Sequence, residues 1–282
     1  MGDLAKAILC VGVAGCVLAA VPAAGFDTAP SLRGGMLKAS DLLLNLDTDG
    51  AATECRRLLS MPQSEALGRF CLSLVTLTHA EDQDTPARDL DRFLEQARQA
   101  RAAAEAQERA APSDAEVKLL LGLIHGSKAM VDGGRKHYLA ALHGVREAHR
   151  YFEEAQQLDP TLVDASYGLG LYHLVMARLP GTVKPFVSIV LPAGDPELGL
   201  KELERVAAQG TFLKATARVV LLQLYAGSEQ KYPEALRLGE DLLRRYTGNP
   251  ELYFATAHAA SEVGRFEEAL ELDFSFGIRG LA

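Results

Sequence analysis

Two short stretches of this chain repeat one pattern at an interval of 48 residues. The sequence LGLIH begins at Leu121 and LGLYH begins at Leu169, and Ala148, Phe152 and Pro160 lie between them. Similarity at a fixed period of about 20 to 50 residues indicates a stack of supersecondary units, each of which buries its apolar face against its neighbours. This repetition constrains the fold more than any other feature of the chain.

The repeated stretches resemble the tetratricopeptide (TPR) repeat family. In that family L-G-x2-Y lies on the first helix of a unit, A-x3-F lies on the second, and a proline closes a unit of about 34 residues. The stretch GRFEEA at 264–269 also resembles the turn between two TPR helices. The resemblance implies an all-α solenoid of stacked antiparallel helix pairs, with clearer repeats at 112–272 and degenerate repeats at 37–111.

Composition agrees with helices throughout the chain. Hydrophobic residues make up 48% of the 282 residues, aromatic residues make up only 6%, and tryptophan is absent. Alanine, leucine and glutamate dominate, and these residues favour helices. The formal net charge of −8 disfavours nucleic acid as a partner, because its binding requires neutralisation of phosphates.

The N-terminal segment, residues 1–25, reads as a signal peptide or an N-terminal anchor. Lys6 precedes an apolar stretch at 7–20, and small residues follow it. Three alternatives stay open, namely cleavage, retention as a membrane anchor, and lipidation at Cys16. All three place the body of the protein outside the cytoplasm, in the periplasm or cell envelope.

Helix boundaries follow from the apolar spacing and the turn residues. Residues 26–36 form the expected flexible lead-in, and the helical pattern begins near Leu37. The expected turn inside the clearest unit is 132–134, since it contains two glycines. The expected helices of the clearer repeats are 115–130, 135–158, 164–176, 198–209, 215–225 and 232–246.

Two cysteines of the helical body, Cys55 and Cys71, lie on either side of a turn at Pro62. Antiparallel helices would bring them together, and an oxidising compartment would then permit a disulfide. The alternative is a pair of small buried thiols without chemistry.

The TPR resemblance implies a concave groove lined by the first helix of each unit. The family's groove positions fall in this sequence on Leu119, Leu123, Asp164, Tyr167, Leu171, Val220, Leu224, Glu251, Phe254 and His258. TPR proteins hold extended peptides or helices of other proteins in that groove. Most of these residues are apolar, so the alternative is that they belong to the core between repeats. The lysine and asparagine of a carboxylate-binding clamp are absent from them.

An irregular insert interrupts the repeats at 179–196. Four prolines surround its apolar run at 187–191, so we expect a non-helical segment. Long irregular loops are more often functional or packed than idle. The insert either fills the groove as a plug or contacts a membrane surface or a partner.

Enzyme signatures are weak in this sequence. The histidines show no H-E-x-x-H, the cysteines no C-x-x-C and the serines no G-x-S-x-G. His125 and His173 stand singly on repeat helices, so we interpret them as core residues or hydrogen-bonding groups rather than ligands. The sequence therefore implies no catalytic residue, metal or cofactor.

The expected function is a non-catalytic scaffold or adaptor that mediates protein–protein interactions in the cell envelope. One alternative is an enzyme or enzyme accessory subunit with a site at 179–196, and another is a membrane-tethered assembly factor. The apolar residues at 274–278 stand where a terminal repeat normally carries a polar cap. A partner or another subunit would cover them in an oligomer; alternatively, the chain is a fragment.

Overall fold

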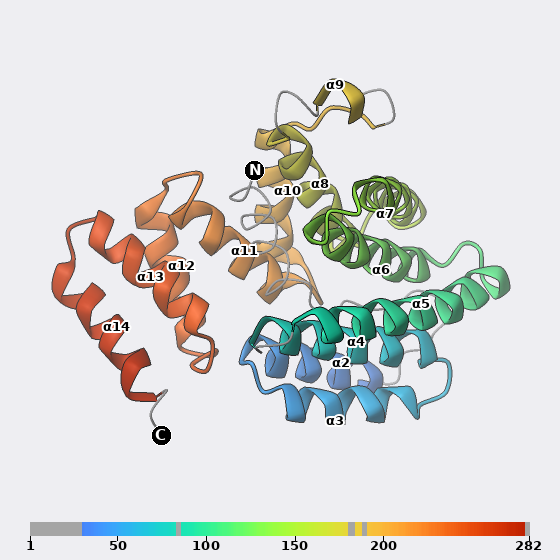
Figure 1. Cartoon of the computed structure of the whole chain (residues 1–282), viewed down its shortest axis with the longest axis horizontal. Coiled ribbons are helices and arrows are strands. Elements are labelled where there is room, and N and C mark those ends of the chain that lie inside the picture. Colours follow the sequence, from blue (N-terminus) through green and yellow to red (C-terminus); the bar gives the residue numbers. More distant parts are fainter. Residues whose placement is uncertain (1–29, 83–85, 180–183, 188–190, 280–282) are drawn as a thin grey trace.

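The chain folds into packed helices. The structure is a computed structural model, which describes residues 30–82, 86–179, 184–187 and 191–279. Every regular element in these described ranges is an α-helix, which confirms the all-α class (Figure 1). The expectations for the export segment at 1–25, including lipidation at Cys16, lie outside the described residues.

The helices follow one another with short connections. In chain order they are α2 (Pro30–Leu44), α3 (Thr48–Leu59), α4 (Glu65–Asp82), α5 (Pro86–Ala110), α6 (Ala115–Gly134), α7 (Tyr138–Leu158), α8 (Ala165–Ala177), α9 (Lys184–Val187), α10 (Pro196–Gln209), α11 (Lys214–Ala226), α12 (Tyr232–Leu243), α13 (Pro250–Glu262) and α14 (Phe266–Arg279). Within the described helices, none combines the length and the apolar composition needed to cross a membrane.

Contacts between helices run in series along the chain. Each helix packs against the next one, except that α8 packs against α10 across the short α9. Contacts between next-but-one helices join α2 to α4, α6 to α8 and α11 to α13. A large apolar core results, which extends from Met36 on α2 to Ala260 on α13.

The ring of Phe152 on α7 lies between a glycine of the first repeated stretch, Gly122, and Gly168, which directly precedes the second stretch. A Cβ on Gly122 of α6 would lie 2.7 Å from the ring, and a Cβ on Gly168 of α8 would overlap it. Neither glycine has a positive φ, so both are needed for space rather than for backbone conformation. The phenylalanine of one motif thus packs against glycines of both neighbouring helices.

A second close approach joins α8 to α10. A Cβ on Gly170 would lie 2.8 Å from the carbonyl oxygen of Gly199, and a Cβ on Gly199 would lie 2.7 Å from that of Gly170. Real Cβ atoms do not approach an oxygen so closely, so both positions require glycine. These two glycines therefore allow the backbones of α8 and α10 to approach closely.

We predict that Gly168→Ala destabilises the fold by about 2 kcal/mol or more, because the added methyl group has no room beside Phe152. Gly126→Ala is the matched control on α6. A Cβ there would only meet Ala148 at 3.8 Å, and alanine in a helix is favoured over glycine by about 0.5 to 1 kcal/mol. Urea denaturation checks both variants. Equal stability of the two proteins would contradict the packing role of Gly168.

Two sequence expectations about helix ends are wrong. The helical pattern begins at Pro30 instead of near Leu37, so residues 30–36 are not a lead-in loop. Proline suits the first turn of a helix, since the amide hydrogen that it lacks has no partner there anyway. Helix α6, the first helix of the clearest unit, also continues through the expected turn at 132–134 and ends at Gly134.

The observed turn after α6 uses a lysine where glycine is usual. Lys136 has φ 64°, the left-handed conformation that often ends a helix. The amide of His137 donates to the carbonyl oxygen of Asp132 at 2.8 Å, and the amide of Lys136 donates to Gly133 at 3.0 Å. Extending α6 buries Val131, which gives the physical reason for the longer helix.

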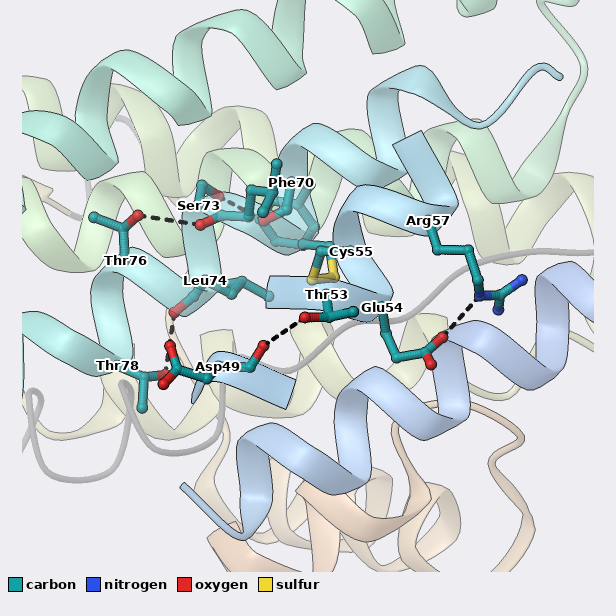
Figure 2. Close-up of a disulfide and its surroundings, with 12 residues drawn as sticks. Asp49, Thr53, Glu54, Cys55, Arg57, Phe70, Ser73, Leu74, Thr76 and Thr78 are labelled. Carbon is teal, nitrogen blue, oxygen red and sulfur yellow. Dashed lines mark hydrogen bonds and ion pairs between the residues drawn. A yellow bond between two sulfur atoms is a disulfide. The ribbon is translucent and has the colours of Figure 1, made fainter. Parts of the chain in front are cut away.

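A disulfide joins α3 to α4 through Cys55 and Cys71 (Figure 2). Their Cα atoms are 5.4 Å apart, and both side chains are fully buried. Figure 2 shows the sulfur atoms between the two helices, with Phe70 and Leu74 of α4 nearby. Of the two alternatives that the sequence left open, the structure contains the disulfide.

We predict that the double variant Cys55→Ser/Cys71→Ser loses about 3 kcal/mol of folding stability, as the closure of a short loop implies. Thermal or urea denaturation of the oxidised wild type measures the loss. Wild-type protein that has been unfolded and refolded under reducing conditions should match the variant, while the variant itself should not respond to reductant. A variant as stable as the oxidised protein would contradict a stabilising role for the bond.

The end of α2 contacts the turn between α12 and α13, more than 200 residues away (Figure 1). The Asn249 side-chain amide donates to the carbonyl oxygen of Leu44 at 2.9 Å, and the Tyr246 hydroxyl donates to the Asp41 carboxylate at 2.8 Å. Arg245 forms an ion pair with the same carboxylate. The first described helix is therefore bonded to the turn between α12 and α13.

Candidate functional site

Most of the expected groove residues are closed to a partner. The six buried members are Leu119, Leu123, Asp164, Tyr167, Val220 and Leu224, and Leu171 is half-buried against the core. They belong to α6, α8 and α11 or, for Asp164, directly precede α8, and most residues of these three helices are buried. These six positions therefore belong to the core, which is the alternative that the sequence left open.

Asp164 has a structural role that its position on the expected groove did not suggest. Its carboxylate accepts hydrogen bonds from the backbone amides of Thr211 at 3.0 Å, Phe212 at 3.0 Å and Leu213 at 2.7 Å. These residues form the connection that leads into α11. Asp164 therefore fixes the start of α11 against the beginning of α8.

We predict that Asp164→Ala destabilises folding by about 3 kcal/mol, because three backbone amides, two of them buried, lose a charged acceptor. Asp164→Asn keeps one acceptor oxygen and should lose roughly half as much. Chemical denaturation of both variants measures these losses. Wild-type stability in Asp164→Ala would show that the carboxylate has no structural role.

The remaining expected groove residues, Glu251, Phe254 and His258, are exposed on α13. Phe254 keeps 50% of its surface exposed, and Phe266 and Leu270 of α14 keep 63% and 57%. Together these helices enclose a groove of about 440 Å³. Its lining consists of Phe254, Ala257, His258, Ser261, Phe266, Ala269 and Leu270. We call this surface the α13–α14 groove.

The opposite face of α13 explains why these side chains point outward. Leu252, Tyr253, Thr256 and Ala260 are buried where α13 packs against α11 and α12. A Cβ on Gly239 of α12 would overlap Thr256, so the two helices are in close contact. One face of α13 is thus committed to the core, and the groove occupies the other.

Four exposed glutamates lie on the two helices that form the α13–α14 groove, and we call them its rim. Glu251, Glu262, Glu267 and Glu271 are all exposed. The nearby cation, Arg265, is held by Glu240 at 3.1 Å and by Glu268 at 2.5 Å. Burial raises the pKa of Glu268, and the proximity of Glu240 and Glu271 adds to this rise against the effect of Arg265. The groove therefore combines an apolar lining with a negative rim.

Sequence reasoning missed the contribution of α14 to this groove. Phe266 and Ala269 were interpreted only as part of the motif that turns the chain between two helices. Phe266 and Leu270 are four residues apart, which places both on one face of a helix. That spacing was the signal that could have identified them. The side chains of residues 273–282, which include the apolar run at 274–278, lie outside the described part.

A second concave site lies between α5 and α6, with a volume of about 390 Å³. His125 lies in its wall and stacks on Tyr151, with ring centroids 5.6 Å apart. Burial, aided by the charge of Arg101, lowers the pKa of His125 to about 4, so the imidazole is neutral at pH 7. The cations around this cleft already have carboxylate neighbours, since Arg98 pairs with Glu95 at 2.6 Å.

The described part of the insert packs on α7 and α8. Leu191 is buried against Tyr172 and Met176, and Val187 lies against the same cluster. The Tyr172 hydroxyl donates to the carbonyl oxygen of Pro192 at 2.6 Å. None of the ten expected groove residues belongs to this cluster, so these insert residues do not plug the groove.

The insert is also not entirely non-helical, because Lys184–Val187 forms the short helix α9. A proline in the first turn is compatible with a helix, which explains the difference from the sequence expectation. Contact of the insert with a membrane or partner stays a prediction.

Two further ionisable groups, Glu202 and His173, interact with neighbouring parts of the fold. Burial raises the pKa of Glu202 on α10 to about 7, against the lowering effect of Arg205. His173 accepts a hydrogen bond from the backbone amide of Asp195 at 3.1 Å, in line with a hydrogen-bonding role. The residues that the structure describes include no group of three histidine, cysteine or acidic side chains arranged to hold a metal ion.

No family model matches the chain.

Proposed function

We propose that this protein is a non-catalytic scaffold of the cell envelope, and that it binds another protein at the α13–α14 groove. The observation that carries the proposal is the concentration of large exposed apolar side chains along that groove. Exposed apolar surface of this kind marks interaction sites in soluble proteins. Aromatic residues in such positions commonly supply most of the binding energy.

The proposed architecture is a TPR-like α-solenoid of stacked helix pairs. The serial contacts between successive helices support it. The glycines of the two repeated motifs support it as well, since Gly122 allows close packing of Phe152 and Gly170 allows close packing of Gly199. Solenoids of this type act through surfaces formed by stacked helices rather than through an enclosed active site.

The proposed location outside the cytoplasm has two supports. Residues 1–25 have the composition of an export segment. The Cys55–Cys71 disulfide suits an oxidising compartment, because thiols in the cytoplasm are normally kept reduced. No comparable observation favours an enzyme site at the insert or a membrane tether.

We predict that Phe254→Glu lowers the recovery of bound partner from envelope extracts by at least about tenfold, because a charge replaces an aromatic contact. Leu198→Glu on α10 is the matched control, since Leu198 is 42% exposed and lies outside the groove. Quantitative affinity capture with the wild type and both variants measures the effect. Tyr167→Glu is unsuitable, because Tyr167 is 1% exposed and the change would disrupt the core.

Circular dichroism and urea denaturation would establish that both variants are folded. Equal recovery of partners by folded Phe254→Glu and by wild type would contradict the proposed function of the groove. An equal loss in Leu198→Glu would also contradict it, since any added surface charge would then have the same effect.

A further inference from the structure

Equivalent residues on α8 and α13 show how the α13–α14 groove would be covered. Asp164, Tyr167 and Leu171 have the same spacing as Glu251, Phe254 and His258. The first two of these positions, Asp164 directly before α8 and Tyr167 on α8, are buried, and Asp164 accepts a backbone hydrogen bond at the start of α11. On α13 the corresponding positions are exposed. The α13–α14 groove thus exposes the positions whose equivalents at α8 are mostly covered by the rest of the fold.

The packing of α13 itself supports a helix as the occupant. This helix lies against both members of the preceding pair, α11 and α12. Small residues allow the approach there, as the contact between Gly239 and Thr256 shows. The α13–α14 groove likewise has small residues in its lining, Ala257 and Ala269, between larger ones. A helix in that groove would place apolar side chains against the alanines.

The rim glutamates indicate the charge that a helix bound in the groove would carry. On α13 Glu251 and Glu262 lie on the same helical stripe as Phe254, because the spacings are multiples of three and four residues. On α14 Glu267 and Glu271 follow the two exposed apolar residues directly. A cationic partner would be attracted to this rim, and an anionic one would be repelled.

We propose that the occupant of the α13–α14 groove is an amphipathic α-helix of a partner protein, with lysine or arginine on both sides of its apolar stripe. Its apolar residues recur at intervals of three and four positions, and its basic residues face the four rim glutamates. This proposal rests on the proposed function, since it specifies the partner of the same groove.

Two synthetic helices of 18 residues test the proposal by fluorescence anisotropy. Both carry leucine at alternating intervals of three and four residues; one has lysine beside the stripe and the other has glutamate at the same positions. We expect the wild type to bind the lysine peptide at least tenfold more tightly. Added salt should reduce this difference, because the rim charges are exposed. Phe254→Glu should abolish binding of both peptides.

Charge-matched variants separate the rim from the overall negative charge of the protein. The rim variant combines Glu251→Gln, Glu262→Gln, Glu267→Gln and Glu271→Gln. The remote variant changes four exposed glutamates on other helices, Glu65, Glu95, Glu153 and Glu197, to glutamine. The rim variant should reduce the preference for lysine to less than about threefold, and the remote variant should keep most of it.

The possible results separate this inference from the proposed function. Equal binding of both peptides, lost in Phe254→Glu, would overturn the charge preference but leave the groove as a binding site. Equal effects of the rim and remote variants would also overturn it. Binding of neither peptide at millimolar concentration would overturn the helical occupant, while partner capture would still test the function. Self-association of the wild type that Phe254→Glu abolishes would show that a second copy of the chain occupies the groove, and would overturn the proposal.

Discussion

The contact between the Phe152 ring and two glycines determines the spacing of the helices around it. Gly122 and Gly168 leave the volume that the ring fills, so α7 approaches α6 and α8 together. Protein interiors are close-packed, and even one added methyl group in such a contact is destabilising. The glycines of the repeated L-G motifs, Gly122 beside Phe152 and Gly170 beside Gly199, therefore each meet a packing requirement. This explains why a pattern of so few residues predicts the architecture without predicting any chemistry.

The sequence predicted the order of the helices and most of their ends, because apolar periodicity and capping residues are local signals. Asp114 illustrates this, since its carboxylate accepts the backbone amides of Glu116 and Val117 at the start of α6. The end of α6 was wrong because Lys136, rather than a glycine, adopts the left-handed conformation. Local composition favoured the adjacent glycines, whereas the burial of Val131 favoured a longer helix.

The candidate site was predictable only in part. Apolar spacing identifies the face of a helix that avoids water, but it does not identify what covers that face. Tyr167 and Phe254 occupy equivalent positions, yet only the second is accessible. The bonds between α2 and the α12–α13 turn, such as that between Asn249 and Leu44, join residues about 200 positions apart. No local pattern in the sequence indicates them, so this contact could not be predicted.

The comparison of Tyr167 with Phe254 also gives the energetic reason for proposing a binding surface at α13 and α14. Covering the exposed half of one aromatic side chain removes on the order of 100 Å² from water, which contributes about 2 to 3 kcal/mol. In the interior of the array, Tyr167 is already buried. On α13 and α14, Phe254, Phe266 and Leu270 keep half or more of their surface exposed. Under the proposed function, stability within the array and affinity at the groove would arise from one kind of contact, and the glutamates on the two helices would favour a basic helix as the occupant.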